Sequence, residues 1–175
     1  MLRGCVPRTI PPLGGRVGGR HQSARIVTAD GLSIGVVTHS TAANSPAAMR
    51  VLVYSDNAET RRRVKFALGK RPHPDLPDME YIEIATQAAL IQQVDAGTID
   101  LAILDGEAAP AGGMGSARQL KDEVDSCPPI LVLTSRADDA WLVRWSGAEG
   151  SVPHPIDPIR MAAAAIPLLR TRLLA

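Results

Sequence analysis

The sequence is poor in cysteine and aromatic residues, and it contains no long apolar run. Its two cysteines, Cys5 and Cys127, lie far apart and outside any CxxC pattern, which argues against a disulfide scaffold or a structural zinc site. No apolar run approaches the roughly 18 residues of a membrane helix. A net charge of +1 over 175 residues gives no general attraction to nucleic acid or anionic lipid. We therefore expect a cytoplasmic protein with no transmembrane segment and no nucleic-acid partner.

The near-neutral charge hides two unlike segments, 1–48 and 49–175. The first holds five arginines against the single acid Asp30, together with seven of the 15 glycines. Such a composition buries too little apolar surface to order itself, so an irregular extension, flexible or ordered by a partner, is expected. Met49 stands directly before the first predicted strand, which leaves a start of translation at that residue as an alternative.

From Met49 onward the pattern predicts five strands alternating with five helices. Short apolar runs rich in β-branched residues predict buried parallel strands. The expected strands are 50–55, 81–85, 101–104, 130–133 and 151–152. The expected helices begin after the caps Asn57, Thr86 and Asp157, near Ala117, and at Asp138. A glycine-rich loop is expected over 105–115, and Pro167 should kink or break the last helix.

Five βα units over about 125 residues indicate a doubly wound parallel sheet with helices on both faces. The flavodoxin-like (βα)5 fold, with strand order 2-1-3-4-5, suits this number of strands. In that order the binding crevice lies at the carboxyl ends of strands 1 and 3. Those ends carry Ser55, Asp56 and Asp105, so two carboxylates are expected to lie together.

Four motifs at the ends of these strands resemble the receiver domain of two-component response regulators, over residues 50–174. They read VLVYSDN (51–57), DLAILDG (100–106), PPILVLTSR (128–136) and GAEGSVPHPIDP (147–158). The resemblance implies that Asp105 corresponds to the phosphoacceptor and Asp56 to an acid that helps hold magnesium. It also implies that Thr134 corresponds to the hydroxyl, and His154 to the lysine, that contact the phosphoryl group.

Three positions depart from the family pattern. Ser55 stands where a first acid belongs, His154 replaces the lysine, and Ser151 replaces the switch aromatic. Phosphoryl transfer depends on a metal and on cations that neutralise developing charge. A histidine is mostly neutral near pH 7 at its ordinary pKa of about 6.5. We therefore expect no bound cofactor and at most weak magnesium binding at Asp56 and Asp105. His154 either forms a hydrogen bond or ion pair with Asp105, which leaves the pocket inactive, or contacts phosphate.

Trp141 and Trp145 are the only tryptophans, and they are four residues apart in the fourth predicted helix. That spacing puts both on one helix face. Either the pair packs inward against the sheet, or it forms a docking surface, since tryptophan is enriched at binding hot spots. In receivers the region of the fourth helix is used for output or dimerisation, which favours an interface.

These features favour a non-enzymatic receiver-like protein that acts as an interaction or accessory subunit of a larger assembly. The resemblance extends to receiver-like proteins associated with bacterial proton-pumping NADH dehydrogenase, which would place the protein peripherally at the inner membrane through that partner. The alternative is a single-domain response regulator that a histidine kinase phosphorylates on Asp105. A binding domain for a small anion or nucleotide in the same crevice is a third interpretation.

Overall fold

The computed structural model describes residues 47–135 and 139–174. The predictions for 1–46, including the irregular extension, lie outside the described residues. No helix in the described ranges is both long and apolar enough to cross a membrane.

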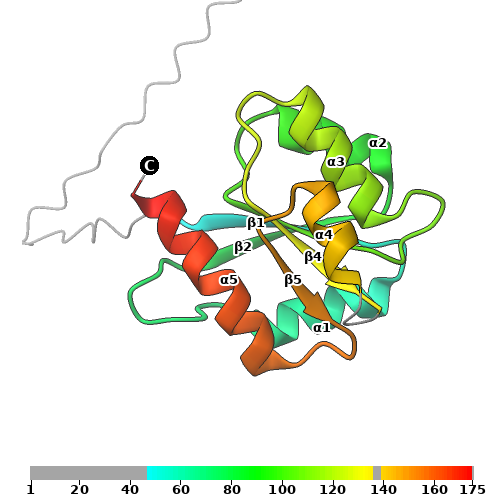
Figure 1. Cartoon of the computed structure of the whole chain (residues 1–175). Coiled ribbons are helices and arrows are strands. Elements are labelled where there is room, and N and C mark those ends of the chain that lie inside the picture. Colours follow the sequence, from blue (N-terminus) through cyan, green and yellow to red (C-terminus); the bar gives the residue numbers. More distant parts are fainter. Residues whose placement is uncertain (1–46, 136–138, 175) are drawn as a thin grey trace, which may run out of the picture. The chain divides into compact units, whose positions relative to one another are not determined.

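Five parallel strands alternate with five helices, as the sequence predicts (Figure 1). The strands are β1 Met49–Tyr54, β2 Met79–Ile84, β3 Leu101–Asp105, β4 Ile130–Thr134 and β5 Gly150–Pro153. The helices are α1 Ala58–Leu68, α2 Gln87–Asp95, α3 Gly113–Glu123, α4 Ala140–Ser146 and α5 Pro158–Leu173. The sheet order is β2-β1-β3-β4-β5, so the predicted doubly wound, flavodoxin-like fold is confirmed.

Alternate side chains of the central strands pack into two separate hydrophobic cores, one on each face of the sheet. Val51, Val53 and Ile103 pack beneath the helices α1 and α5. Leu52 and Leu104 point to the opposite face, where α2 and α3 cover them. Because both faces are covered, every residue of β3 and β4 is buried, which explains their continuous apolar sequence.

The predicted caps form at three helix starts. The side chains of Asn57, Thr86 and Asp157 accept hydrogen bonds from the backbone N–H groups of Glu59, Ala89 and Arg160. Each cap satisfies one of the donors that a helix start leaves without an internal partner.

Two boundary predictions are wrong. The helix α5 continues through Pro167 to Leu173. Pro167 and Ala163 lie on the exposed side, where water can replace the backbone hydrogen bond that proline removes, while Met161, Ala165 and Leu169 are buried. The glycine-rich loop is also shorter than predicted, since α3 begins at Gly113.

Gly113 places the start of α3 directly against the end of β3. A Cβ at this position would lie 2.5 Å from the backbone oxygen of Asp105 and 2.7 Å from its carbonyl carbon. A Cβ on Gly115, two residues later, would meet nothing within 4 Å. Only the first glycine is therefore required by packing.

We expect Gly113→Ala to lower the free energy of unfolding by about 1–3 kcal/mol, because two backbone segments must separate to admit the methyl group. The matched change Gly115→Ala should be neutral or stabilise by up to about 1 kcal/mol, through better helix propensity. Urea unfolding of both variants measures the difference. Equal effects of the two changes would contradict the close approach as the cause.

Candidate functional site

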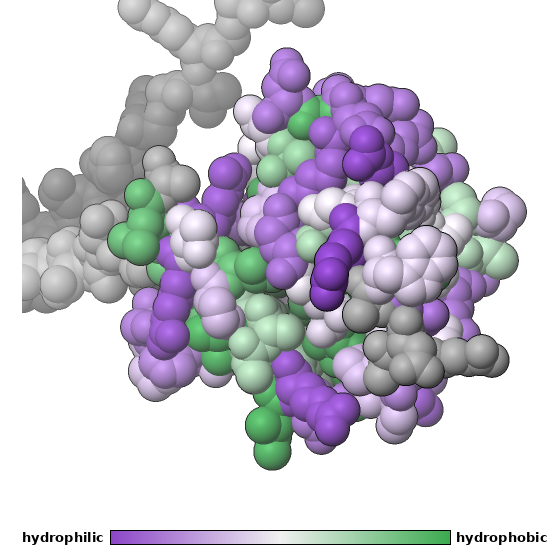
Figure 2. Space-filling view, in the orientation of Figure 1, coloured by the Kyte–Doolittle hydropathy of each residue, from purple (hydrophilic) through white to green (hydrophobic). Residues whose placement is uncertain are grey.

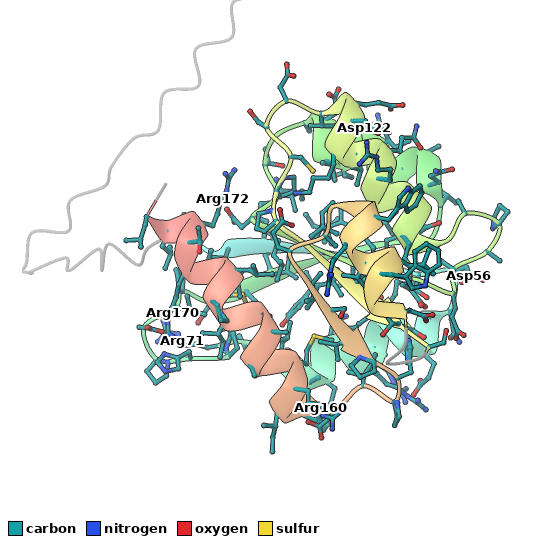
Figure 3. All side chains as sticks on the ribbon, viewed as in Figure 1. Asp56, Arg71, Asp122, Arg160, Arg170 and Arg172 are labelled. Carbon is teal, nitrogen blue, oxygen red and sulfur yellow. The ribbon has the colours of Figure 1, made fainter. Side chains whose placement is uncertain are left out.

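Side chains from four parallel strands meet at one edge of the sheet. Ser55 and Asp56 follow β1, while Asp105 is the last residue of β3 and Thr134 the last residue of β4. His154 follows β5 directly. Figure 3 shows Asp56 at this end of the molecule, with Arg172 of α5 at the opposite end of the view. Parallel strands that end together thus place the predicted pocket residues at one edge of the sheet.

The Asp105 carboxylate is buried and accepts hydrogen bonds on both oxygens. The Ser55 hydroxyl donates to Oδ2 at 2.7 Å, and the backbone N–H of Glu107 donates to Oδ1 at 3.1 Å. The Ser55 oxygen in turn accepts from the backbone N–H of Asn57 at 3.0 Å. These bonds fix the orientation of the carboxylate and connect the end of β1 to the end of β3.

His154 faces the same carboxylate without a hydrogen bond. Its Nε2 lies 3.8 Å from Asp105 Oδ1, and this nitrogen is buried with no hydrogen-bond partner. The backbone N–H of His154 donates to the Thr134 carbonyl at 2.8 Å, which fixes the loop after β5. The imidazole therefore lies beside the Asp105 carboxylate, and both expectations for His154, contact with Asp105 and contact with phosphate, stay predictions.

Two residues that sequence reasoning missed complete the rim of the pocket. The Glu107 carboxylate accepts a hydrogen bond from the Ser135 hydroxyl, so the loop after β3 is tied to the end of β4. Arg61 on α1 donates to the Ser55 carbonyl and also pairs with Glu83 of β2 at 3.3 Å. The position of Glu107, two residues after Asp105, was the available signal.

A third missed residue, Tyr54, is buried next to the pocket. Its hydroxyl donates to the Ala111 carbonyl at 2.7 Å and so anchors the loop between β3 and α3. Burial raises the pKa of the Tyr54 phenol, and the nearby carboxylates of Asp56 and Asp105 raise it further. The phenol therefore stays neutral and acts as a hydrogen-bond donor.

The donor set at this edge does not fit a strong magnesium site. Within residues 47–135 and 139–174, no three acid, histidine or cysteine side chains gather as metal ligands. Asp56 is exposed, and one oxygen of Asp105 already accepts from Ser55. Magnesium binding relies on few carboxylates, so a serine in place of an acid removes a charge that the site needs.

Both tryptophans of α4 point outward, which rules out the inward alternative. Trp141 is 66% exposed and Trp145 is 52% exposed. The inner side of α4 carries Val143 and Ser146 instead, and both are buried. The pair therefore belongs to the surface of the molecule, and not to the strand-end pocket.

Comparison with known proteins gives one clear relationship. Residues of this chain are 64% identical over 127 positions to an "uncharacterized response regulatory protein" of Mycobacterium tuberculosis, found in two strains, covering 73% of this chain and 96% of the relative. No family model matches.

Solved structures share the fold at low sequence identity. The receiver domain of a LuxO repressor protein from Vibrio parahaemolyticus superposes with a TM-score of 0.59 at 22% identity, covering 73% of this chain and 94% of that one. The chemotaxis response regulator CheY4 of Vibrio cholerae gives 0.56 at 18% identity, covering 69% and 98%. With the fold, the strand-end carboxylates and a relative of high identity in agreement, the chain belongs to the response regulator receiver family.

Proposed function

We propose that this protein is a response regulator whose receiver domain passes a signal to a partner by direct contact, without catalysing a reaction of its own. The observation that carries the proposal is the buried Asp105 at the carboxyl end of β3, beside Thr134 and His154. The name of the M. tuberculosis relative supports it. On this proposal the protein works in the cytoplasm.

Asp105 is the residue on which a phosphoryl donor of the histidine kinase class would act. In that transfer an oxygen of the Asp105 carboxylate forms a bond to phosphorus, while the bond between phosphorus and the donor nitrogen breaks. The Thr134 hydroxyl, at the end of the neighbouring strand, would donate to a phosphoryl oxygen. The relatives' names favour this phosphorelay role over that of an accessory subunit.

The electrostatics of the pocket make such a transfer slow. Negative charge on a phosphoryl group needs nearby permanent cations, and His154 supplies one only when it is protonated. Asp105 is also held by the Ser55 hydroxyl, which must be displaced from Oδ2 before that oxygen can react. We therefore propose that the native pocket binds magnesium weakly and accepts phosphate poorly.

Restoring the two missing groups should reverse this weakness. The double change Ser55→Asp with His154→Lys adds one carboxylate and one permanent cation to the pocket. We expect it to tighten magnesium binding by about tenfold or more, equivalent to at least about 1.4 kcal/mol. Calorimetric magnesium titration and labelling with acetyl phosphate provide the measurements.

The control is the same double variant with Asp105→Asn, which should take no label. Rapid, stoichiometric labelling of the native protein at Asp105, with no gain from the double change, would contradict the proposed weakness. That result would establish an ordinary phosphorelay regulator.

A second candidate function is docking that does not depend on phosphorylation, as for an accessory subunit of a larger assembly. The exposed Trp141 and Trp145 favour it, because two indoles open to solvent are unusual unless a partner covers them. The NADH dehydrogenase partner implied by the sequence resemblance rests on no contact among the described residues, so it stays a prediction.

Partner association separates the two functions. If docking is independent of phosphorylation, Asp105→Asn should leave association nearly unchanged, whereas Trp141→Ala should weaken it by about 2 kcal/mol or more. Tagged variants, isolated from the native host with quantification of each retained protein, measure both effects. Thermal melts of each variant show whether folding is intact. Loss of association in Asp105→Asn alone would instead identify a regulator gated by phosphorylation.

A further inference from the structure

The outward face of α4 presents a compact group of three side chains: Trp141, Arg144 and Trp145. Residues at spacing i, i+3 and i+4 lie together on a helix surface. All three are exposed, whereas Val143 and Ser146 on the opposite side of the helix are buried. Figure 2 shows a pale surface over α4, beside the more hydrophilic surface over α3. We call these three residues the α4 patch.

The charge of Arg144 is uncompensated among the described residues. Apart from Arg160, every other lysine and arginine in residues 47–135 and 139–174 lies within 4.0 Å of a carboxylate. On the neighbouring helix α3, Arg118 pairs with Asp122 at 2.8 Å, and Glu123 accepts a hydrogen bond from the Gln119 amide. Likewise Lys121 holds Glu149 at 2.6 Å.

The acid at the start of α4, Asp139, does not neutralise the charge of the α4 patch. Asp139 stands at the N-cap position and is half-buried. It precedes Trp141 by two residues, a spacing at which side chains on a helix do not face each other. Within residues 47–135 and 139–174 no carboxylate lies within 4.0 Å of the Arg144 guanidinium, so this described part of the patch is cationic and aromatic.

We propose that the α4 patch binds an acidic segment of a protein partner, whose carboxylate pairs with Arg144 and whose apolar side chains cover the two indoles. This rests on the docking role proposed above and adds the chemistry of the partner. Tryptophan and arginine are the residues most enriched at interface hot spots. The planar guanidinium can donate two parallel hydrogen bonds to one carboxylate. A basic segment would be repelled, so the patch selects by charge as well as by apolar contact.

Tryptophan fluorescence, excited selectively over that of the two tyrosines, reports on this patch alone, because Trp141 and Trp145 are the only tryptophans in the chain. The probe is a synthetic amphipathic helical peptide with leucine on one side and glutamate elsewhere, and its matched form with lysine in place of glutamate. With the full-length protein, we expect the glutamate peptide to shift the emission to shorter wavelength and to protect it from acrylamide quenching. The lysine peptide should do neither at the same concentration.

Charge reversal gives the sharper test. Arg144→Glu should weaken binding of the glutamate peptide by about tenfold or more and should let the lysine peptide bind instead. The matched control is Arg160→Glu, which makes the same charge change at another unpaired arginine, on α5. The control should leave both affinities within about twofold. Both positions are exposed, and thermal melts will show that the fold is retained.

Three outcomes would overturn the proposal. Equal binding of the two peptides would show that charge plays no part. An equal emission shift with phosphatidylglycerol vesicles would assign the patch to a lipid surface, and a shift with protein concentration alone would assign it to a second copy of the chain. If Trp141→Ala abolishes partner association while Arg144→Glu does not, the docking role stands and only the acidic chemistry fails.

Discussion

Parallel pairing of β1 with β3 is the constraint on which the rest of the site depends. Val51 to Tyr54 pair with Leu101 to Leu104 in one register, so the residues that follow each strand arrive side by side. That alignment allows the Ser55 hydroxyl to reach Asp105 at 2.7 Å inside the protein. A buried carboxylate that lacks donors is costly, and here the folding of the sheet itself supplies them. The registers of β3 with β4 and of β4 with β5 place Thr134 and His154 at the same end of the sheet.

The pocket keeps the architecture of a receiver but has a different balance of charge. A serine replaces one acid and a histidine replaces the lysine, so the site loses a negative and a permanent positive group together. The two losses partly offset each other. With fewer acids nearby, the buried Asp105 carboxylate needs less stabilisation by a neighbouring cation. Ser55 and the Glu107 N–H then satisfy Asp105 internally. The buried Asp105 thus has hydrogen-bond donors from the protein itself, and the proposed weakness of phosphoryl acceptance rests on the serine and histidine that replace the two charged groups.

The sequence predicted the residues whose positions depend on strand ends, and missed those whose positions depend on loops. Asp105 follows from an apolar run and its boundary, whereas Thr134 and His154 follow from the resemblance to receiver domains. Tyr54 contributes by anchoring the loop between β3 and α3, whose path no local pattern encodes. Glu107 could have been found only from its position two residues after Asp105. The prediction that Pro167 kinks or breaks the last helix was wrong, because helix propensity does not take into account which side of a helix faces solvent. The outward direction of the tryptophans could not be read from spacing alone, since i,i+4 fits a buried stripe equally well.

The strand-end pocket and the α4 patch respond differently to dissolved salt, so their contributions to partner association can be separated. The Asp105 contacts are buried in a low-dielectric interior, where dissolved salt screens little. Arg144 is exposed, so its attraction for a carboxylate must weaken once ionic strength brings the Debye length below about 10 Å. Association that falls with salt yet is unchanged by Asp105→Asn is the behaviour expected of docking at the α4 patch alone. Association that follows the state of Asp105 depends on the strand-end pocket, whichever surface the partner contacts. Salt and the change at Asp105, measured together, therefore separate docking at α4 from gating by the pocket.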